Sequence, residues 1–306
     1  MENDTENKWA NRHPFEVWQS KEVAELLAEF FSANFEKAGV SGKLAENYVL
    51  KVWNEKNKKD KEILRQECDE IFEKVKNGVK NPPDEIEPIN LFDFSNVDTF
   101  LDIGANKLST INYLAERNKK IRKFIAVDII PKRREFVDPE RGEYIQISSN
   151  AESFPIAKES ADFVNIQFVF HHFENKKATE MMLENCREVL KPYGKLLLWE
   201  ESFAEKMDPN LLNINNGLGI KTDKFFTDKF YSLDENKRWE FIIANDWLIN
   251  VNNPHMPWTG QYYKWGEWIK IFQEAGFVPE KEYNFGLRIN GRVKQGLHIL
   301  GLFKKL

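Results

Sequence analysis

Residues 97–109, VDTFLDIGANKLS, run from an apolar strand through a tight turn into the start of a helix. In such a strand–turn–helix, the backbone N–H groups at the helix N-terminus face the ligand crevice of an open α/β sheet. Gly104 has no Cβ and lets a ligand approach its backbone, and Asn106 is one of the few non-glycine residues that accept a left-handed conformation. A tight turn without a ligand fits these residues equally well.

Short apolar runs alternate with helical patterns on the C-terminal side of this stretch, as in a parallel sheet with crossover helices. The expected strands are 123–130, 143–147, 161–170 and 194–201, and the expected helices are 108–120, 176–192 and 265–277. Residues 278–289 and 296–305 read as a final antiparallel pair. We therefore predict an α/β fold with a doubly wound sheet.

The N-terminal part of the chain has helical rather than strand periodicity. Residues 1–90 read as a helical cap, and the prolines of NPPDEIEP (81–88) place a domain junction before the domain 91–306. Within that domain, residues 202–263 are rich in aromatic side chains and too long for a plain loop, so we expect an inserted lid.

Composition excludes several classes of protein. The chain has 306 residues, 42% hydrophobic and 30% charged, which is enough for a substantial core. It has no long apolar span and no N-terminal targeting pattern, which predicts a soluble, cytoplasmic protein without a membrane partner. Cys68 and Cys186 lack metal-ligand spacing, so we expect neither a zinc site nor a disulfide, and no metal cofactor.

Charge argues against a nucleic-acid substrate. The formal net charge is −5, and residues 1–90 carry 14 Lys and Arg against 19 Asp and Glu. Nucleic-acid-binding domains usually have a clustered positive surface. The basic stretches 117–123 and 131–134 read as solvated surface rather than as such a patch.

Asp128 ends the second expected strand, 26 residues after Asp102. A carboxylate at this place can accept hydrogen bonds from both ribose hydroxyls of a nucleoside cofactor. A solvated strand-end aspartate is the alternative.

These features, together with NAESFP (150–155), ADFVNIQFVFHHF (161–173) and REVLKPYGKLLLWE (187–200), resemble the class I S-adenosylmethionine-dependent methyltransferases. The resemblance covers about residues 95–201. It implies a Rossmann-like seven-stranded sheet with an antiparallel last strand, and S-adenosyl-L-methionine as the cofactor.

The resemblance also implies roles for individual residues. Asp102, Gly104, Ala105 and Asn106 would lie under the methionine portion, Asp128 would hold the ribose, and Ile129 would pack on adenine. Asn150 and Ala151 would contact the adenine edge, while Gln167 and Phe168 would lie below the sulfonium side. The family loop is typically D-x-G-x-G-x-G, whereas this chain has Asn106 and Leu108 in place of the second and third glycines.

Methyl transfer requires an aligned nucleophile, exclusion of water and sometimes removal of a proton. His171 and His172 follow the fourth strand and are our candidates for a general base, with packing as the alternative role. Glu200 and Glu201 end the fifth strand and open onto the same crevice. Glu200 is therefore a candidate for binding the substrate, with a solvated strand end as the alternative.

The aromatic segment completes the predicted site. His255, Trp258 and Tyr262 are the residues that we expect to contact substrate, since aromatic rings wall pockets and exclude water. The leading hypothesis is a methyltransferase acting on a small molecule, as a monomer or homodimer. The alternatives are a degenerate methyltransferase-like binding or scaffold protein and a methyltransferase acting on RNA or protein. An NAD-dependent dehydrogenase ranks last because G-x-G-x-x-G is lacking.

Overall fold

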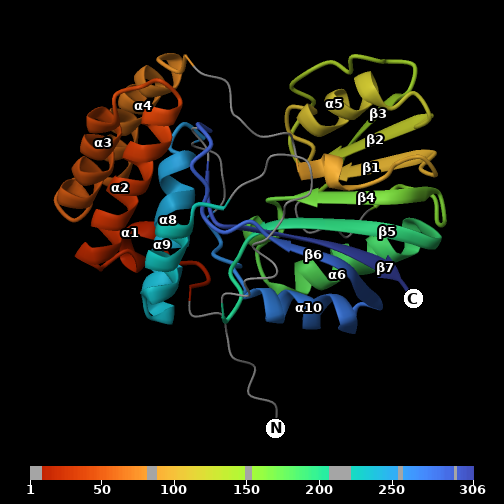
Figure 1. The fold of residues 1–306 in the computed structure, drawn as a ribbon. Coiled ribbons are helices and arrows are strands. Elements are labelled where there is room, and N and C mark those ends of the chain that lie inside the picture. Colours follow the sequence, from red (N-terminus) through yellow and green to blue (C-terminus); the bar gives the residue numbers. More distant parts are fainter. Residues whose placement is uncertain (1–8, 81–87, 149–153, 207–221, 254–257, 293–294) are drawn as a thin grey trace, which may run out of the picture.

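The computed structural model describes residues 9–80, 88–148, 154–206, 222–253, 258–292 and 295–306. These residues form a helical lobe and an α/β lobe that lie next to each other (Figure 1). Within this part of the chain, no helix is long and apolar enough to cross a membrane.

The α/β lobe contains a sheet of seven strands in the order β3-β2-β1-β4-β5-β7-β6. The first five strands in this order are parallel, and β7 is antiparallel to both of its neighbours. The predicted doubly wound sheet with an antiparallel last strand is confirmed. The strands are β1 (Thr99–Ile103), β2 (Lys123–Asp128), β3 (Gly142–Gln146), β4 (Ala161–Gln167), β5 (Leu190–Glu201), β6 (Phe277–Asn284) and β7 (His298–Lys305).

Helices cover both faces of this sheet, which explains why β1 is buried along its whole length. Alternate residues of β1 divide between two cores: Leu101 packs with α6 (Lys176–Val189) and α10 (Trp265–Glu274), and Phe100 packs with α5 (Ser109–Arg117). Two short 3₁₀ helices, η1 (Pro88–Leu91) and η2 (Phe170–His172), flank the sheet.

The helical lobe combines two segments that are distant in sequence. Its helices are α1 (Pro14–Val17), α2 (Lys21–Lys37), α3 (Gly42–Glu55), α4 (Lys61–Asn77), α8 (Lys224–Ser232) and α9 (Glu235–Ile249). Side-chain caps start several of them, as where Asp60 accepts the N–H groups of Glu62 and Ile63. Apolar residues of all six helices share one core. The helices of the predicted lid therefore pack with the N-terminal helices, while the domain boundaries themselves stay predictions, and 81–87 lies outside the described residues.

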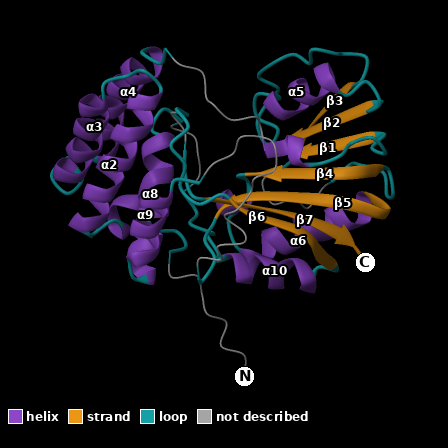
Figure 2. Ribbon diagram, in the orientation of Figure 1, coloured by secondary structure: helices purple, strands orange, loops and turns teal. Residues whose placement is uncertain are grey.

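The two lobes meet at the edge of the sheet where the parallel strands have their carboxyl ends. Figure 2 shows the carboxyl ends of the parallel strands directed towards the helical lobe. Ligands of open α/β sheets bind outside these carboxyl ends. The fold thus places β1, β2, β4 and β5 so that their last residues face α9 and the segments that join the lobes.

Candidate active site

The turn after β1 has an unusual backbone. Gly104, Asn106 and Leu108 have φ values of +71°, +41° and +56°. A Cβ on Gly104 would lie 2.3 Å from Cγ2 of Val169, so both the conformation and the space require glycine. Leu108 is fully buried in the core beneath α5, and its side chain fills that core. Positive φ at these positions reverses the chain directly over the strand ends.

Asp128 holds this turn in place. Its Oδ2 accepts the N–H of Asn106 at 2.7 Å, and its Oδ1 accepts the N–H of Ile130 at 3.2 Å. The neighbouring Ile129 is 45% exposed, a large apolar side chain facing solvent beside a strand-end carboxylate. An exposed apolar side chain at this place is available to pack on a planar ligand.

Asp102 lies at the same edge in a buried polar chain. Its Oδ1 accepts the amide N–H of Asn165 at 2.6 Å, and Oδ1 of Asn165 accepts the amide N–H of Gln167 at 3.0 Å. Burial raises the pKa of Asp102 to about 7, and the charge of Asp128 contributes to that rise. Asp102 therefore gains or loses its proton near neutral pH. We call Asp102, Gly104, Asn106, Asp128 and Ile129 the cofactor edge.

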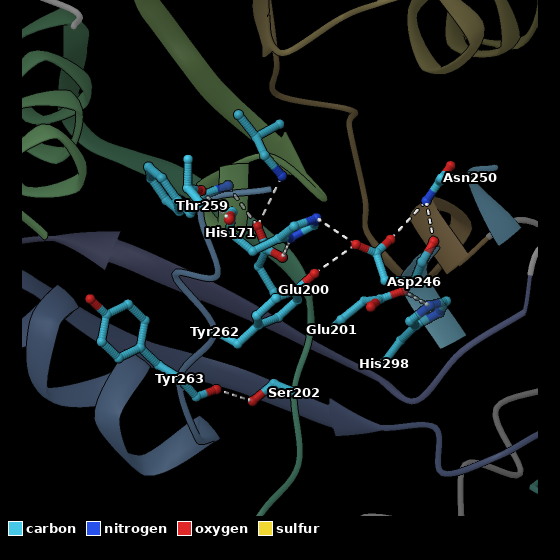
Figure 3. A network of polar contacts seen from close by, with 12 residues as sticks. His171, Glu200, Glu201, Ser202, Asp246, Asn250, Thr259, Tyr262, Tyr263 and His298 are labelled. Atoms are coloured by element: carbon cyan, nitrogen blue, oxygen red, sulfur yellow. Dashed lines mark hydrogen bonds and ion pairs between the residues drawn. The ribbon is translucent and has the colours of Figure 1, made fainter. Parts of the chain in front are cut away.

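The next group lies where the sheet meets the helical lobe (Figure 3). Nδ1 of His171 is 2.6 Å from Oε2 of Glu200, and Oε1 of Glu200 accepts the N–H groups of Val169 and Phe170 at 2.9 and 2.8 Å. His171 and Glu200 are both buried. Every oxygen of Glu200 thus has a partner within the protein.

Asp246 of α9 joins this pair from the other lobe. Its Oδ2 lies 4.0 Å from Nε2 of His171 and accepts the hydroxyl of Tyr262 at 2.6 Å, while its Oδ1 accepts the amide N–H of Asn250 at 2.7 Å. The Tyr262 ring stacks on His171 with centroids 5.1 Å apart. This cluster therefore ties helix α9 to the end of β5, which connects the two lobes.

These carboxylates set the protonation of the histidine. Burial by itself lowers the pKa of His171, but the charges of Glu200 and Asp246 outweigh burial, and the pKa is raised overall. Burial raises the pKa of Glu200, and His171 with the backbone N–H groups reverses that effect, so its pKa is lowered overall. Each partner therefore favours the charged form of the other, an imidazolium facing a carboxylate.

Glu201 and His298 differ from that pair. They are cross-strand neighbours in β5 and β7, with Oε1 of Glu201 3.8 Å from Nε2 of His298. Oε2 of Glu201 is buried and has no hydrogen-bond partner. Burial raises the pKa of Glu201, and Asp246 and Glu200 add to the rise. We call His171, Glu200, Glu201, Asp246, Tyr262 and His298 the junction.

His298 is a neutral imidazole. Burial lowers its pKa, and the positive charge of Arg288 adds to this. Nη2 of Arg288 lies 3.4 Å from Nδ1 of His298. Because a guanidinium can only donate, Nδ1 is the acceptor and the ring hydrogen sits on Nε2, towards Glu201.

The remaining predicted residues lie in several places. Thr259 Oγ1 donates to the carbonyl of His171 at 2.8 Å, which fixes the segment that leads to Tyr262. Trp258 is half-buried against the core of the helical lobe, and the half-buried ring of His172 has its centroid 3.9 Å from that of His171. Phe168 has a φ of +55° and lies with its ring centroid 4.7 Å from that of His298. Asn150, Ala151 and His255 lie outside the described residues, and Ala105 is buried in the turn.

Local sequence patterns do not single out Asp246, Asn245, Arg288 and His298 as site residues. A signal for the first two exists, because Asn245 and Asp246 interrupt the apolar run of residues 242–249, IIANDWLI, and both are buried. A buried polar pair within an apolar stretch of a helix is expected to have partners. His298 lies within the apolar strand β7, where periodicity alone does not separate it from packing.

One family model and several solved structures are similar to parts of this chain. Residues 101–198 match the family model described as "Methyltransferase domain". Solved structures that are similar include a SAM-dependent methyltransferase from Methanosarcina mazei, with 15% identity over 72% of this chain and 99% of that one and a TM-score of 0.44. Another is a SAM-dependent methyltransferase from Aquifex aeolicus, with 16% identity over 68% of this chain and 82% of that one and a TM-score of 0.39. A search of curated protein sequences finds no match.

The sheet order and the turn after β1 are those of a doubly wound α/β domain, in which ligands bind at this edge of the sheet. The match over residues 101–198 identifies this segment as a methyltransferase domain. The methyl donor that such a domain would take is S-adenosylmethionine.

The residues at the cofactor edge fit this molecule. Asp102 and Asp128 bring two carboxyl groups to one edge, and burial disfavours charge on Asp102. The ammonium and sulfonium of S-adenosylmethionine would supply compensating positive charge to these carboxyl groups. Ile129 is exposed beside Asp128, as a contact for the adenine ring requires.

Proposed function

We propose that this methyltransferase acts on a small molecule bound at the junction. The observation that carries the proposal is the burial of the polar groups there: His171, Asp246 and His298 are 2%, 2% and 6% exposed, beneath the helical lobe. A base in a folded RNA or a side chain on a protein surface would need an open approach to this edge, whereas a small acceptor can be enclosed.

The cofactor edge holds the methyl donor in this proposal. Asp128 accepts from the ribose, Ile129 packs on adenine, and Asp102 with the turn 104–106 faces the methionine portion. Gln167 and Phe168 lie towards the sulfonium, and Asn150 and Ala151, which lie outside the described residues, stay predicted contacts of the adenine edge. The bound cofactor supplies a methyl group already activated by the sulfonium, so the chain has to orient the acceptor and exclude water.

The geometry favours a positioning role for His171. A general base must be free of its proton, but His171 lies between Glu200 and Asp246, and its pKa is raised. In the proposed site this imidazolium fixes the two carboxylates and thereby the approach of α9. The hydroxyl of Tyr262 and both oxygens of Glu200 support it, while His172, His255 and Trp258 remain proposed contacts of the acceptor.

The test uses cofactor with a radiolabelled methyl group. The protein is incubated with a cell extract divided by ultrafiltration into small molecules and macromolecules, and with Asp128→Asn as the control for cofactor dependence. We expect label in the small-molecule fraction only, and none with the variant. Label in RNA or protein would replace this proposal by the macromolecular alternative, and no label in either fraction would favour a binding or scaffold protein.

A further inference from the structure

Asn165 is a polar side chain in a deeply buried part of the sheet. It lies in β4 between Val164 and Ile166, and all three residues are 0% exposed. Burial of an amide is unfavourable unless the amide is hydrogen-bonded, and an apolar residue suits a strand that is buried on both faces. The reason for an asparagine at this place must therefore lie in its partners.

The strand register places Asn165 beside the carboxyl group of Asp102. Asn165 is the cross-strand neighbour of Asp102 in β1 on one side and of the apolar Leu197 in β5 on the other. Nδ2 of Asn165 donates to Oδ1 of Asp102 at 2.6 Å. On its other side Asp102 has Ala126 of β2 as its neighbour. Among the described residues, Asn165 is thus the donor to this carboxyl group, and Oδ2 of Asp102 is left for a ligand.

Further hydrogen bonds fix the orientation of the Asn165 amide. Its Oδ1 accepts the amide N–H of Gln167 at 3.0 Å, and Oε1 of Gln167 accepts the hydroxyl of Thr110 in α5 at 3.4 Å. Gln167 and Thr110 are half-buried, whereas Asn165 and Asp102 are buried. All these bonds run in one direction, from Thr110 to Asp102. The amide of Asn165 therefore presents its N–H to the carboxyl group of Asp102.

The charge of Asp102 depends on this hydrogen bond. Burial disfavours the carboxylate, and the negative charge of Asp128 at the end of β2 adds to that effect. The hydrogen bond from Asn165 opposes both, and the resulting pKa of Asp102 is about 7. The cross-strand neighbours Ala126 and Asn165 carry no charge of their own. Loss of the Asn165 amide would therefore leave Asp102 more protonated at neutral pH.

We propose that Asn165 is a positioning residue for the methyl donor: it holds the carboxyl group of Asp102 in place and favours its charged form, so that Oδ2 can accept the ammonium group of the methionine portion. The inference rests on the proposed function for the place of the methionine portion beside Asp102, and it is independent of the acceptor. Asn165 acts through Asp102 and has no contact of its own with the cofactor.

The test measures the protons released when the cofactor binds. S-adenosylmethionine is titrated calorimetrically into the protein at pH 7, in two buffers of different ionisation enthalpy. Asp102, with a pKa of about 7, is half protonated at this pH, so the wild type should release about half a proton. Asn165→Leu removes the donor at similar volume. It should release close to about one proton and bind about tenfold more weakly.

Two variants place the effect at Asp102. Asp102→Asn supplies the baseline, because an amide releases no proton, and any proton exchanged by the cofactor itself is thereby subtracted. Adding Asn165→Leu to Asp102→Asn should change proton release no further, because Asn165 acts through Asp102.

Phe163→Leu is the matched control. Phe163 is buried in β4 two residues before Asn165, so the two side chains share one face of the sheet. The shorter side chain loosens the packing and should lower stability in urea, but proton release should stay at the wild-type value. If Asn165→Leu does not fold, as judged by urea unfolding, Asn165→Val replaces it, because valine suits a strand.

Unchanged proton release and affinity in Asn165→Leu would overturn the inference, and so would a wild type that releases no more protons than Asp102→Asn. The same change in Phe163→Leu would also overturn it, since general loosening of β4 would then explain the effect. Methyl label found only in macromolecules would instead remove the proposed small-molecule acceptor. The inference about Asn165 would then stand, because these titrations contain no acceptor. A wild type that does not bind S-adenosylmethionine would remove both proposals.

Discussion

The cofactor edge and the junction lie at the same side of one sheet but are built differently. The cofactor edge consists of residues close together in the chain, since Asp102, Gly104 and Asn106 belong to one turn and Asp128 ends the adjacent strand. The junction collects His171, Glu200, Asp246 and His298 from η2, β5, α9 and β7. In our proposal, a local motif thus binds the cofactor, while residues brought together by the whole fold contact the acceptor.

The two regions also differ in electrostatics. Asp102 at the cofactor edge has a pKa near neutrality and gains from a positively charged ligand. At the junction, both oxygens of Glu200 have partners within the protein, whereas Nε2 of His171 has no hydrogen bond and lies 4.0 Å from Oδ2 of Asp246. We therefore expect substitutions at the junction to act first on stability and those at the cofactor edge to act first on binding.

The largest effect is expected from Glu200→Ala. It leaves the imidazolium of His171 buried without its partner and removes the acceptor of the Val169 and Phe170 N–H groups. Breaking a buried charge pair in this way costs about 3–5 kcal/mol, measurable as the free energy of unfolding in urea. Glu200→Gln keeps the shape and one acceptor and should cost less. If Glu200→Ala lowers the free energy of unfolding by less than about 1 kcal/mol, the His171–Glu200 pair contributes no more than an exposed ion pair does.

The second prediction concerns cofactor binding. Asp128→Ala removes the acceptor that fixes Asn106 and, in our proposal, holds the ribose, so that affinity for S-adenosylhomocysteine should fall about 10- to 100-fold. Titration calorimetry measures this, and urea unfolding should change less than for Glu200→Ala. Asp98→Asn is the matched control, because Asp98 pairs with Arg122 at the opposite edge of the sheet. Equal losses in both variants would contradict a specific role for Asp128.

The third prediction is a pH dependence. Below pH 7 Asp102 is protonated, and binding of a cationic cofactor must displace that proton. Affinity for S-adenosylmethionine should therefore rise with pH up to about 7, by at most about tenfold per unit, and then level off. S-adenosylhomocysteine lacks the sulfonium charge and should depend less on pH. Asp102→Asn should abolish the dependence, and a dependence that survives in this variant would assign it to another group.

The sequence predicts these two regions to very different extents. The turn around Gly104 and the strands beside it follow from local patterns, because a strand buried on both faces is apolar throughout and positive φ restricts residue type. Glu200 and Tyr262 were predicted as substrate contacts from position, but their polar groups are used by His171 and Asp246. The position of a residue at a strand end predicts that it lies at the carboxyl edge of the sheet. It does not predict which hydrogen-bond partners the side chain has there.

Contacts between residues distant in the chain also distinguish Glu200 from Glu201, which the sequence does not. Glu200 and Glu201 are adjacent and identical in type, so no pattern separates them, yet in the fold only Glu201 keeps a carboxylate oxygen without a hydrogen-bond partner. The decisive neighbours, Asp246 and His298, lie 45 and 97 residues further along the chain than Glu201. Long-range packing of α9 and β7 sets these contacts, and a single sequence carries no direct record of it.

The smallest effect tests whether the junction makes one cooperative unit of the two lobes. Each lobe has one buried cysteine, Cys68 in α4 and Cys186 in α6. Burial raises the pKa of Cys68 to about 12 and raises that of Cys186 as well, so neither thiol should react while its lobe is folded.

Labelling with N-ethylmaleimide at increasing urea, read by mass spectrometry, should give both cysteines the same midpoint. A lobe that opened alone would leave half of the buried His171–Glu200–Asp246 cluster without partners, which couples the two transitions. Glu200→Ala removes that coupling and should let the midpoints separate. Separate midpoints in the wild type would show that the contacts between the lobes are too weak to make them unfold together.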